Sequence, residues 1–388
     1  MQQRYNAVVF IGMVYPGGLI RHFALLGIEL EKATSTFDFY FASINREPDG
    51  GTWQLVRRAT PPESLIAGDT FDDVVSRIDA LFGEYEKVLV HCGGGWGQTR
   101  KLAPLRRKYG RRLVLVGTTH SYRIESSMRV LMSIFQLYLY VRYYDKIVFQ
   151  CKYAASHFCG ARLLFAANKG TIIPLGCESF DGQSQDIPNG IESKPSLARL
   201  LLDKQLFKFV YLAGFRPGKM HVWLVNAMAS VLKRHPDVIV LFCGKGERSV
   251  IDSTITAIRN QNLESQIILP GQIMRSEVPW LLKHCNCAIV PSRAETFGHN
   301  FLEPMFAGLP VLGTRVGVGC DIIVEGETGY SFSLDNTKSV QYGVERLLSD
   351  RERVNAMGMN AKRLVEQNYS HTVVAKRLTE LYTSLLKC

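Results

Sequence analysis

The sequence predicts an α/β protein composed of two doubly wound, Rossmann-like domains. Short apolar runs alternate with helix-length segments along the chain, which is the order of a parallel sheet with helical crossovers. A polar segment rich in turn formers, 176–196, interrupts this order once, and the order then begins again. The length of 388 residues also exceeds what one hydrophobic core usually serves.

The first domain is expected over 1–190, the second over 191–370, and a final helix over 371–388 is expected to pack back toward the first domain. In the first domain, apolar runs predict strands at 8–11, 37–42, 87–91, 113–116 and 146–149. In the second domain, the corresponding runs are 207–213, 238–242, 266–269, 287–290 and 311–313. Two such domains facing each other are expected to form an interdomain cleft beyond the carboxyl ends of their strands, where open α/β sheets bind ligands.

The composition is that of a folded protein in a reducing compartment. Hydrophobic residues make up 46% of the chain and charged residues 21%, which excludes the composition of disordered chains. The nine cysteines are odd in number, scattered and never spaced as Cys-x-x-Cys, so neither a disulfide framework nor a zinc site is predicted. The N-terminal residues show no signal-peptide pattern, and we expect a cytoplasmic protein.

The net charge of +11 is concentrated in one region, because 101–150 contains ten Lys or Arg residues against two acidic ones. The cluster at 100–112 could meet lipid headgroups, nucleic acid or an acidic acceptor, or it could be a solvated helix face. The aromatic stretch 128–144 is too short to cross a bilayer. It could lie in the plane of a membrane surface, although a helix buried in the first domain is the favoured interpretation.

The segment 291–311 has the order strand end, loop, helix, turn and strand. The loop brings Glu295 to the expected cleft, and the start of the helix, near 298–300, would direct free amides and a positive dipole at an anionic phosphate. Glu303 lies about one turn into that helix, where a carboxylate can accept hydrogen bonds from a vicinal diol such as a ribose.

This segment resembles the Glu-x7-Glu motif of retaining glycosyltransferases of the GT-B fold, in glycosyltransferase family 4. The resemblance continues, in the same order, through 308–311, 317–323 and 325–330. It implies that Glu303 binds the ribose of a nucleotide sugar and that Glu295 holds the donor sugar. It also implies donor contacts from the neighbouring residues Thr296, Phe297, Gly298, His299, Asn300 and Leu302.

A second segment, Gly214 to Lys219, follows the first predicted strand of the second domain and supplies Arg216 and Lys219. The family places an Arg and a Lys here to stabilise the leaving diphosphate, and fixed cations can do so without a metal ion. Arg216 departs from the family pattern, in which the Arg directly follows the Gly and lies further from the Lys. Because no Asp-x-Asp motif occurs, we expect no metal and no cofactor besides the nucleotide-sugar donor.

Three further loops resemble donor-binding loops of this family. Gly244 and Gly246 follow one strand of the second domain, and Ile273 follows the next, beside the expected position of the base. In the first domain, Gly17 and Gly18 resemble the loop that closes over the donor phosphates. His120 occupies the place of a family histidine close to the donor sugar, although a lone histidine is often structural.

The resemblance implies a metal-independent, retaining transfer of a hexose, with UDP-glucose expected on family frequency. It also implies that the first domain, 1–190, is the acceptor side and that the second, 191–370, binds the nucleotide sugar. A glycan or lipid-linked acceptor in cell-envelope or exopolysaccharide synthesis is expected, with peripheral association of the protein with the anionic inner face of the membrane. Two alternatives remain open: an enzyme like UDP-N-acetylglucosamine 2-epimerase, which shares the fold, and a non-catalytic basic membrane-binding module. No nucleic acid partner is expected, since no helix-turn-helix, zinc finger or RNA-binding motif occurs. The sequence does not predict the oligomeric state.

Overall fold

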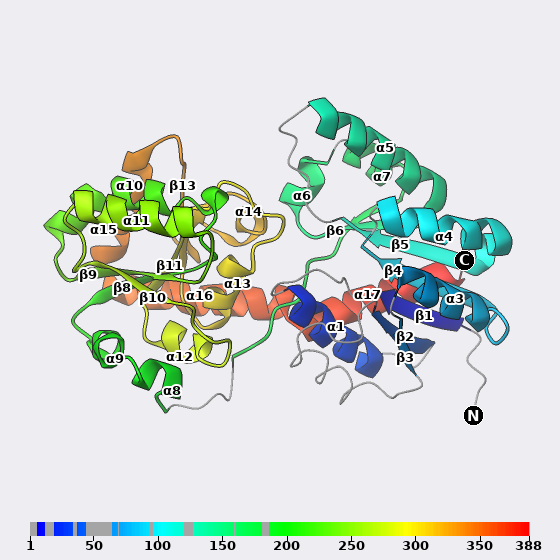
Figure 1. Cartoon of the computed structure of the whole chain (residues 1–388), viewed down its shortest axis with the longest axis horizontal. Helices are drawn as coiled ribbons and strands as arrows, with labels where there is room; N and C mark the ends of the chain where they lie inside the picture. The colour runs from blue at the N-terminus through cyan, green and yellow to red at the C-terminus, as the bar shows by residue number, and fades with distance from the viewer. Residues whose placement is uncertain are drawn as a thin grey trace. The chain divides into compact units, whose positions relative to one another are not determined.

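The computed structural model describes residues 6–11, 19–33, 37–43, 64–68, 70–93, 96–119, 127–158, 160–180 and 186–387. The chain forms two compact units (Figure 1), of which the first comprises 1–178 with 369–388 and the second 179–368. Each unit contains one parallel sheet with helices packed around it. The predicted α/β class is therefore confirmed.

The sheet of the first unit has the strand order β3-β2-β1-β4-β5-β6-β7, with every neighbouring pair parallel. The strands are β1 (Asn6–Ile11), β2 (Asp38–Ser43), β3 (Leu65–Ala67), β4 (Lys87–Cys92), β5 (Leu113–Thr118), β6 (Lys146–Phe149) and β7 (Gly170–Ile172). The five predicted strands are confirmed. The sequence missed β3 and β7, which have three residues each and are too short to show a periodicity.

The helices of the first unit are α1 (Leu19–Ala33), α3 (Phe71–Leu81), α4 (Trp96–Tyr109), α5 (Ser127–Tyr143), α6 (Lys152–Ser156), α7 (Ala161–Ala166) and α17 (His371–Lys387). Helix α3 begins with a capping box, in which the side chains of Thr70 and Asp73 bond to each other's backbone amides. The C-terminal helix α17 packs against α1 and places Tyr382 at full burial, with its hydroxyl 2.5 Å from His91 Nδ1.

The division between the units falls after Glu178 rather than after residue 190, where the sequence placed it. The reason is that residues 186–196 pack on the second unit. Lys194 Nζ donates to the carbonyl of Pro270 at 3.0 Å. Gly190 lies so close to Glu277 that an added Cβ would be 1.8 Å from its Oε1.

The sheet of the second unit has the order β10-β9-β8-β11-β12-β13, again with parallel neighbours. The strands are β8 (Phe207–Leu212), β9 (Val238–Cys243), β10 (Ile267–Gly271), β11 (Cys287–Val290), β12 (Val311–Thr314) and β13 (Gly329–Phe332). The first five confirm the prediction, and β13 was missed. Its sequence of Gly, Tyr, Ser and Phe carries no continuous apolar run.

The helices of the second unit are α8 (Asn189–Glu192), α9 (Pro195–Leu202), α10 (His221–Arg234), α11 (Arg248–Asn260), α12 (Val278–Lys283), α13 (His299–Phe306), α14 (Gly319–Ile322), α15 (Thr337–Leu348) and α16 (Arg351–Tyr369). Figure 1 shows α10, α11 and α15 along one face of the sheet and α12 and α16 along the other. This is the doubly wound arrangement, and it brings the loops that follow the strands together at one edge.

The basic cluster at 100–112 is largely engaged in contacts within the first unit. Arg112 donates to the main-chain carbonyls of Phe82, Tyr85 and Glu86. Among the described residues, the cluster also forms the ion pairs Lys101–Asp72, Arg106–Asp145 and Lys108–Asp79. These contacts favour an ordinary charged helix face over a dedicated anion-binding patch.

Helix α5 has one buried and one exposed side over the residues whose side chains are described. Leu139 and Tyr140 are buried in the core of the first unit. The exposed apolar side chains are Ile134, Phe135, Tyr138 and Val141, which share a face at helical spacing. Among the described residues, no helix is both long enough and apolar enough to span a bilayer.

Candidate functional site

The two motif segments of the second unit meet because the strands that precede them are neighbours in the sheet. Strand β8 leads into Lys219, which ends a short 3₁₀ turn over Pro217–Lys219, and β11 leads into the loop that carries Glu295. Strands β8 and β11 pair directly, so both loops leave the same edge of the sheet. The backbone bond from the Arg293 amide to the Gly218 carbonyl, 2.9 Å long, joins them.

Glu295 lies at the centre of a cluster of hydrogen-bond donors. Its Oε1 atom forms an ion pair with Lys219 Nζ and accepts hydrogen bonds from Ser292 Oγ at 2.7 Å and Asn300 Nδ2 at 3.1 Å. Only 12% of the Glu295 side chain is exposed, so these charge-assisted bonds are shielded from water. Within the described residues Oε2 accepts no hydrogen bond, which leaves it available to a ligand hydroxyl.

Two residues that the sequence did not indicate hold this cluster in place. Tyr211, at the end of β8, donates from its hydroxyl to the carbonyl of Lys219 and lies 3.1 Å from Ser292 Oγ. Its pKa is raised by burial, so the hydroxyl stays protonated. Thr314 Oγ1 donates to the carbonyl of Ser292 at 2.6 Å. Ser292 itself was not predicted as a site residue. Its position just after the predicted strand 287–290 was the one signal for it in the sequence.

The loop of Glu295 ends at Gly298, whose φ of +100° is in the left-handed region that favours glycine. Helix α13 begins directly afterwards at His299. Gly317, with φ of +55°, lets the loop after β12 approach this segment closely, since a Cβ there would lie 2.4 Å from the Phe297 carbonyl. The Val318 amide donates to that same carbonyl at 2.6 Å. The two loops are therefore joined.

Glu303 lies one turn along α13 and is 9% exposed. Its Oε1 atom forms an ion pair with Arg275, a residue beyond β10 that the sequence did not indicate. The Arg275 guanidinium also lies over the ring of Phe180, 5.7 Å from its centroid. A carboxylate offers about four acceptor positions on two oxygens, and the pair with Arg275 is made by Oε1.

Two loops pack so closely after β9 that only glycine fits at Gly244 and Gly246. A Cβ on Gly244 would lie 2.1 Å from the Ala213 carbonyl, and one on Gly246 would lie 2.2 Å from the Phe215 carbonyl. The Glu247 amide donates to that Phe215 carbonyl at 2.8 Å, which joins the loops after β8 and β9.

The remaining predicted residues differ in their exposure and in their contacts with the site. Arg216 is exposed and has no ion pair among the described residues, so Lys219 alone reaches Glu295. Leu302 and Phe297 are buried, and ligand contacts from them would have to be made by the backbone. Thr296, His299 and Ile273 are partly exposed at the same edge of the sheet. The predicted residues Gly17, Gly18 and His120 lie outside the described residues.

His221, the first residue of α10, lies against the site but carries no charge there near neutral pH. Its ring stacks on Phe215 with centroids 4.2 Å apart. Burial, and secondarily the nearby charge of Lys219, lowers the pKa of His221 to about 4. Of His221 and Lys219, only Lys219 therefore carries a positive charge beside Glu295.

The residues at this edge of the sheet lie within a part of the chain that matches a known protein family. Residues 194–364 match the family described as "Glycosyl transferases group 1". The chain is 26% identical over 178 residues to N-acetyl-alpha-D-glucosaminyl L-malate synthase of Bacillus anthracis, covering 46% of this chain and 45% of that one. It is 25% identical over 168 residues to the lipopolysaccharide core biosynthesis mannosyltransferase LpsB of Rhizobium meliloti, covering 42% and 47%. The chain thus matches less than half the length of these curated relatives.

Solved structures resemble the whole chain. The Anabaena protein Alr3699/HepE in complex with UDP superposes with a TM-score of 0.75 at 16% identity, covering 98% of this chain and 100% of that one. The sucrose-phosphate synthase of Thermosynechococcus elongatus superposes with a TM-score of 0.70 at 18% identity, covering 98% and 99%. The chain has the GT-B fold, as its sequence predicted.

Proposed function

We propose that this chain is a glycosyltransferase that takes a hexose from a nucleoside diphosphate sugar, with UDP-glucose as the first candidate donor. The observation that carries the proposal is the pairing of both motif carboxylates with cations at one sheet edge, Glu295 with Lys219 and Glu303 with Arg275. The family match over 194–364 and the GT-B fold support a transferase. The structural neighbour Alr3699/HepE has been crystallised in complex with UDP-glucose, which supports the choice of donor.

In the proposed mechanism, Lys219 stabilises the negative charge that grows on the diphosphate as the bond from the sugar C1 to the phosphate oxygen breaks. The acceptor oxygen bonds to C1 on the same face, and its proton passes to the departing phosphate oxygen. This front-face substitution retains the anomeric configuration without a carboxylate nucleophile. Glu295 positions the sugar through Oε2, and Glu303 accepts hydrogen bonds from the ribose. Lys219, assisted by Arg216, supplies the charge that a divalent ion supplies in metal-dependent enzymes.

The acceptor is proposed to be a glycan or a lipid-linked glycan in cell-envelope or exopolysaccharide synthesis. One relative is named for a role in lipopolysaccharide core biosynthesis, which supports this class. We propose the cytoplasm as the location. Seven cysteines in the described part of the chain are free, and burial raises the pKa of the Cys285 thiol to about 12, which fits a reducing compartment.

Incubation with a panel of UDP-, GDP- and ADP-sugars tests the donor assignment. We expect slow release of free nucleotide from one UDP-sugar, and no release from that donor by the Glu303→Ala variant. Thermal shift by none of the donors would contradict the proposal and favour a binding module. Formation of a 2-epimer of the sugar would instead favour the epimerase alternative.

Membrane association is proposed to use the exposed face of α5, that is Ile134, Phe135, Tyr138 and Val141. We expect the protein to float with vesicles of phosphatidylcholine and phosphatidylglycerol. Replacing Phe135 and Tyr138 with serine should reduce the bound fraction about tenfold, because two aromatic side chains no longer enter the interface. Flotation equal to that of the wild type would contradict this role. Tyr342→Ser, at a 65% exposed position of the other unit, is the matched control.

A further inference from the structure

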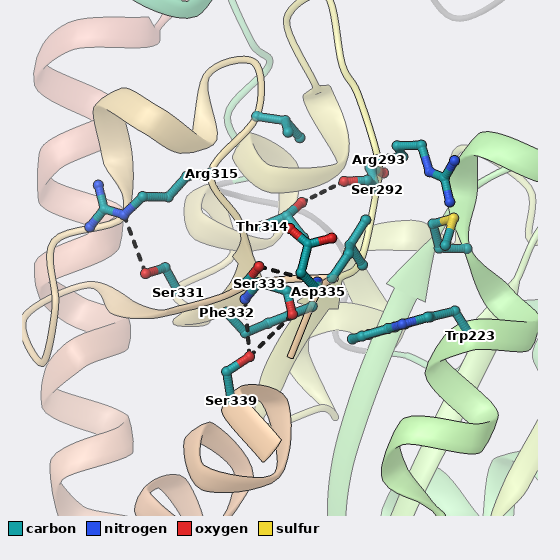
Figure 2. A pocket seen from close by; sticks show the side chains of 13 residues that line it. Trp223, Ser292, Arg293, Thr314, Arg315, Ser331, Phe332, Ser333, Asp335 and Ser339 are labelled. Atoms are coloured by element: carbon teal, nitrogen blue, oxygen red, sulfur yellow. Dashed lines mark hydrogen bonds between the residues drawn. The ribbon is translucent and has the colours of Figure 1, made fainter. Parts of the chain in front are cut away.

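A pocket of about 820 Å³ lies beside the site, at the carboxyl ends of β11, β12 and β13 (Figure 2). The first turn of α10 and the start of α15 complete its wall. It belongs entirely to the second unit. Its volume is within the range of small-molecule sites in proteins. Of the predicted site residues, none lines this pocket.

Aromatic rings form one side of the pocket. The indole of Trp223 and the ring of Phe332 are nearly parallel, with an interplanar angle of 5° and centroids 5.8 Å apart. Phe332 is 6% exposed and packs against the indole from the buried side, whereas Trp223 is only partly buried. In the view of Figure 2 the Trp223 ring lies flat below Arg293. An indole held in this way offers a rigid apolar surface with a polar N–H at its rim.

Three polar groups of the pocket have no side-chain partner among the described residues: the Arg293 guanidinium, the Asp335 carboxylate and the Trp223 indole N–H. Arg315 differs, because its guanidinium donates to Ser331 Oγ at 3.2 Å and pairs with Glu325 at 3.3 Å. Among the described residues, the pocket therefore has one positive and one negative group without an ion pair, Arg293 and Asp335, and their charges cancel. A pocket with balanced charges does not select an anion.

We propose that this pocket binds a neutral saccharide ring. The apolar face of the ring stacks on Trp223, the Asp335 carboxylate accepts from sugar hydroxyls, and Arg293 donates to them. A nucleotide fits less well, since its base could stack on the indole but its phosphates would meet Asp335. The observation that decides between the two ligands is the charge balance of Arg293 and Asp335.

The pocket shares a residue with the donor motif. Ser292 lines the pocket and donates to Glu295, and the pocket residue Met220 directly follows Lys219. A saccharide on Trp223 therefore lies next to the residues proposed to hold the reacting end of the donor. Resting on the proposed function, this makes the pocket a saccharide subsite beside the donor site. The binding of a saccharide to the pocket can be measured without any transfer.

Saturation-transfer NMR on the full chain, without donor, tests the proposal with maltose, cellobiose, mannose and N-acetylglucosamine as probes. We expect at least one probe to bind, and its affinity to fall about tenfold in Trp223→Ala and in Asp335→Asn. Trp223→Phe should restore most of the binding, because it keeps an aromatic surface. Tyr342→Ala, an exposed aromatic outside the pocket, should bind the probe like the wild type.

Addition of saturating UDP separates this pocket from the donor site. Saccharide binding that persists with UDP supports a separate subsite. Competition between UDP and the saccharide would overturn the proposal and assign Trp223 to the donor site. Failure of all four probes to bind, or equal binding by Trp223→Ala, would also overturn it. Loss of donor turnover in Glu303→Ala is a separate result, so the proposed function can fail while the saccharide subsite stands.

Discussion

Replacement of Lys219 with alanine is expected to lower the turnover number for the nucleotide-sugar donor by about 100- to 1000-fold. Lys219 Nζ is the cation that contacts Glu295 at the edge of the sheet, and its side chain is 23% exposed. A partly shielded cation stabilises charge on a leaving diphosphate more strongly than a fully hydrated one. The loss should appear mainly in kcat, because this charge develops in the transition state.

Removal of Lys219 also leaves Glu295 without its counterion, and stability must therefore be measured beside turnover. Lys219→Arg keeps the charge and should retain part of the rate. Lys233→Ala removes an exposed lysine near the end of α10 and should behave like the wild type. Turnover by a folded Lys219→Ala protein at the rate of the Lys233→Ala protein would show that Lys219 does not assist the leaving group.

Replacement of Glu303 with alanine is expected to weaken UDP binding by about 10- to 100-fold, because hydrogen bonds to a buried carboxylate are lost. Glu303 is 9% exposed, and the variant also loses the ion pair with Arg275. The UDP affinity of the neutral isostere Glu303→Gln should lie between those of the wild type and of Glu303→Ala. Isothermal titration with UDP measures all three proteins.

The ribose assignment can be separated from the ion pair with Arg275 by a double cycle. UDP and 2′,3′-dideoxy-UDP are compared on the wild type and on Glu303→Ala. If Glu303 binds the hydroxyls, their removal weakens binding to the wild type but not to the variant. An equal loss in both proteins would leave Glu303 with a structural role only. Glu345→Ala breaks an exposed carboxylate–arginine pair with Arg234 and is the matched control.

The fold was predictable because its signal lies in long apolar runs. Ten strands were predicted from such runs and all ten form. The missed strands, β3, β7 and β13, are sheet-edge segments of three or four residues, which pair because a neighbouring strand is already in place. Their formation depends on the assembled sheet and leaves no local pattern in the sequence.

The candidate site was predictable where a residue belongs to a motif and not where a partner arrives from elsewhere. Glu295, Glu303 and Lys219 were predicted as site residues from their segments, and the structure brings Lys219 to Glu295. Arg275 contacts Glu303 across a sequence separation of 28 residues, and Tyr211 lies within an apolar strand 81 residues before Ser292. Tertiary structure alone brings such partners together. Arg216 shows the reverse case, since it is close to Lys219 in sequence yet is exposed and forms no ion pair among the described residues.

The three hydrogen bonds to Glu295 have a consequence for the entropy of ligand binding. Long side chains such as Glu and Lys lose roughly 1.5–2 kcal/mol of rotamer freedom when they are fixed. Here Lys219, Asn300 and Ser292 already hold the carboxylate in one orientation. That ordering is complete when the chain folds, so an arriving ligand need not supply it. The affinity of this site therefore depends on the bonds that a ligand forms with an already ordered carboxylate, rather than on its ability to organise loose side chains.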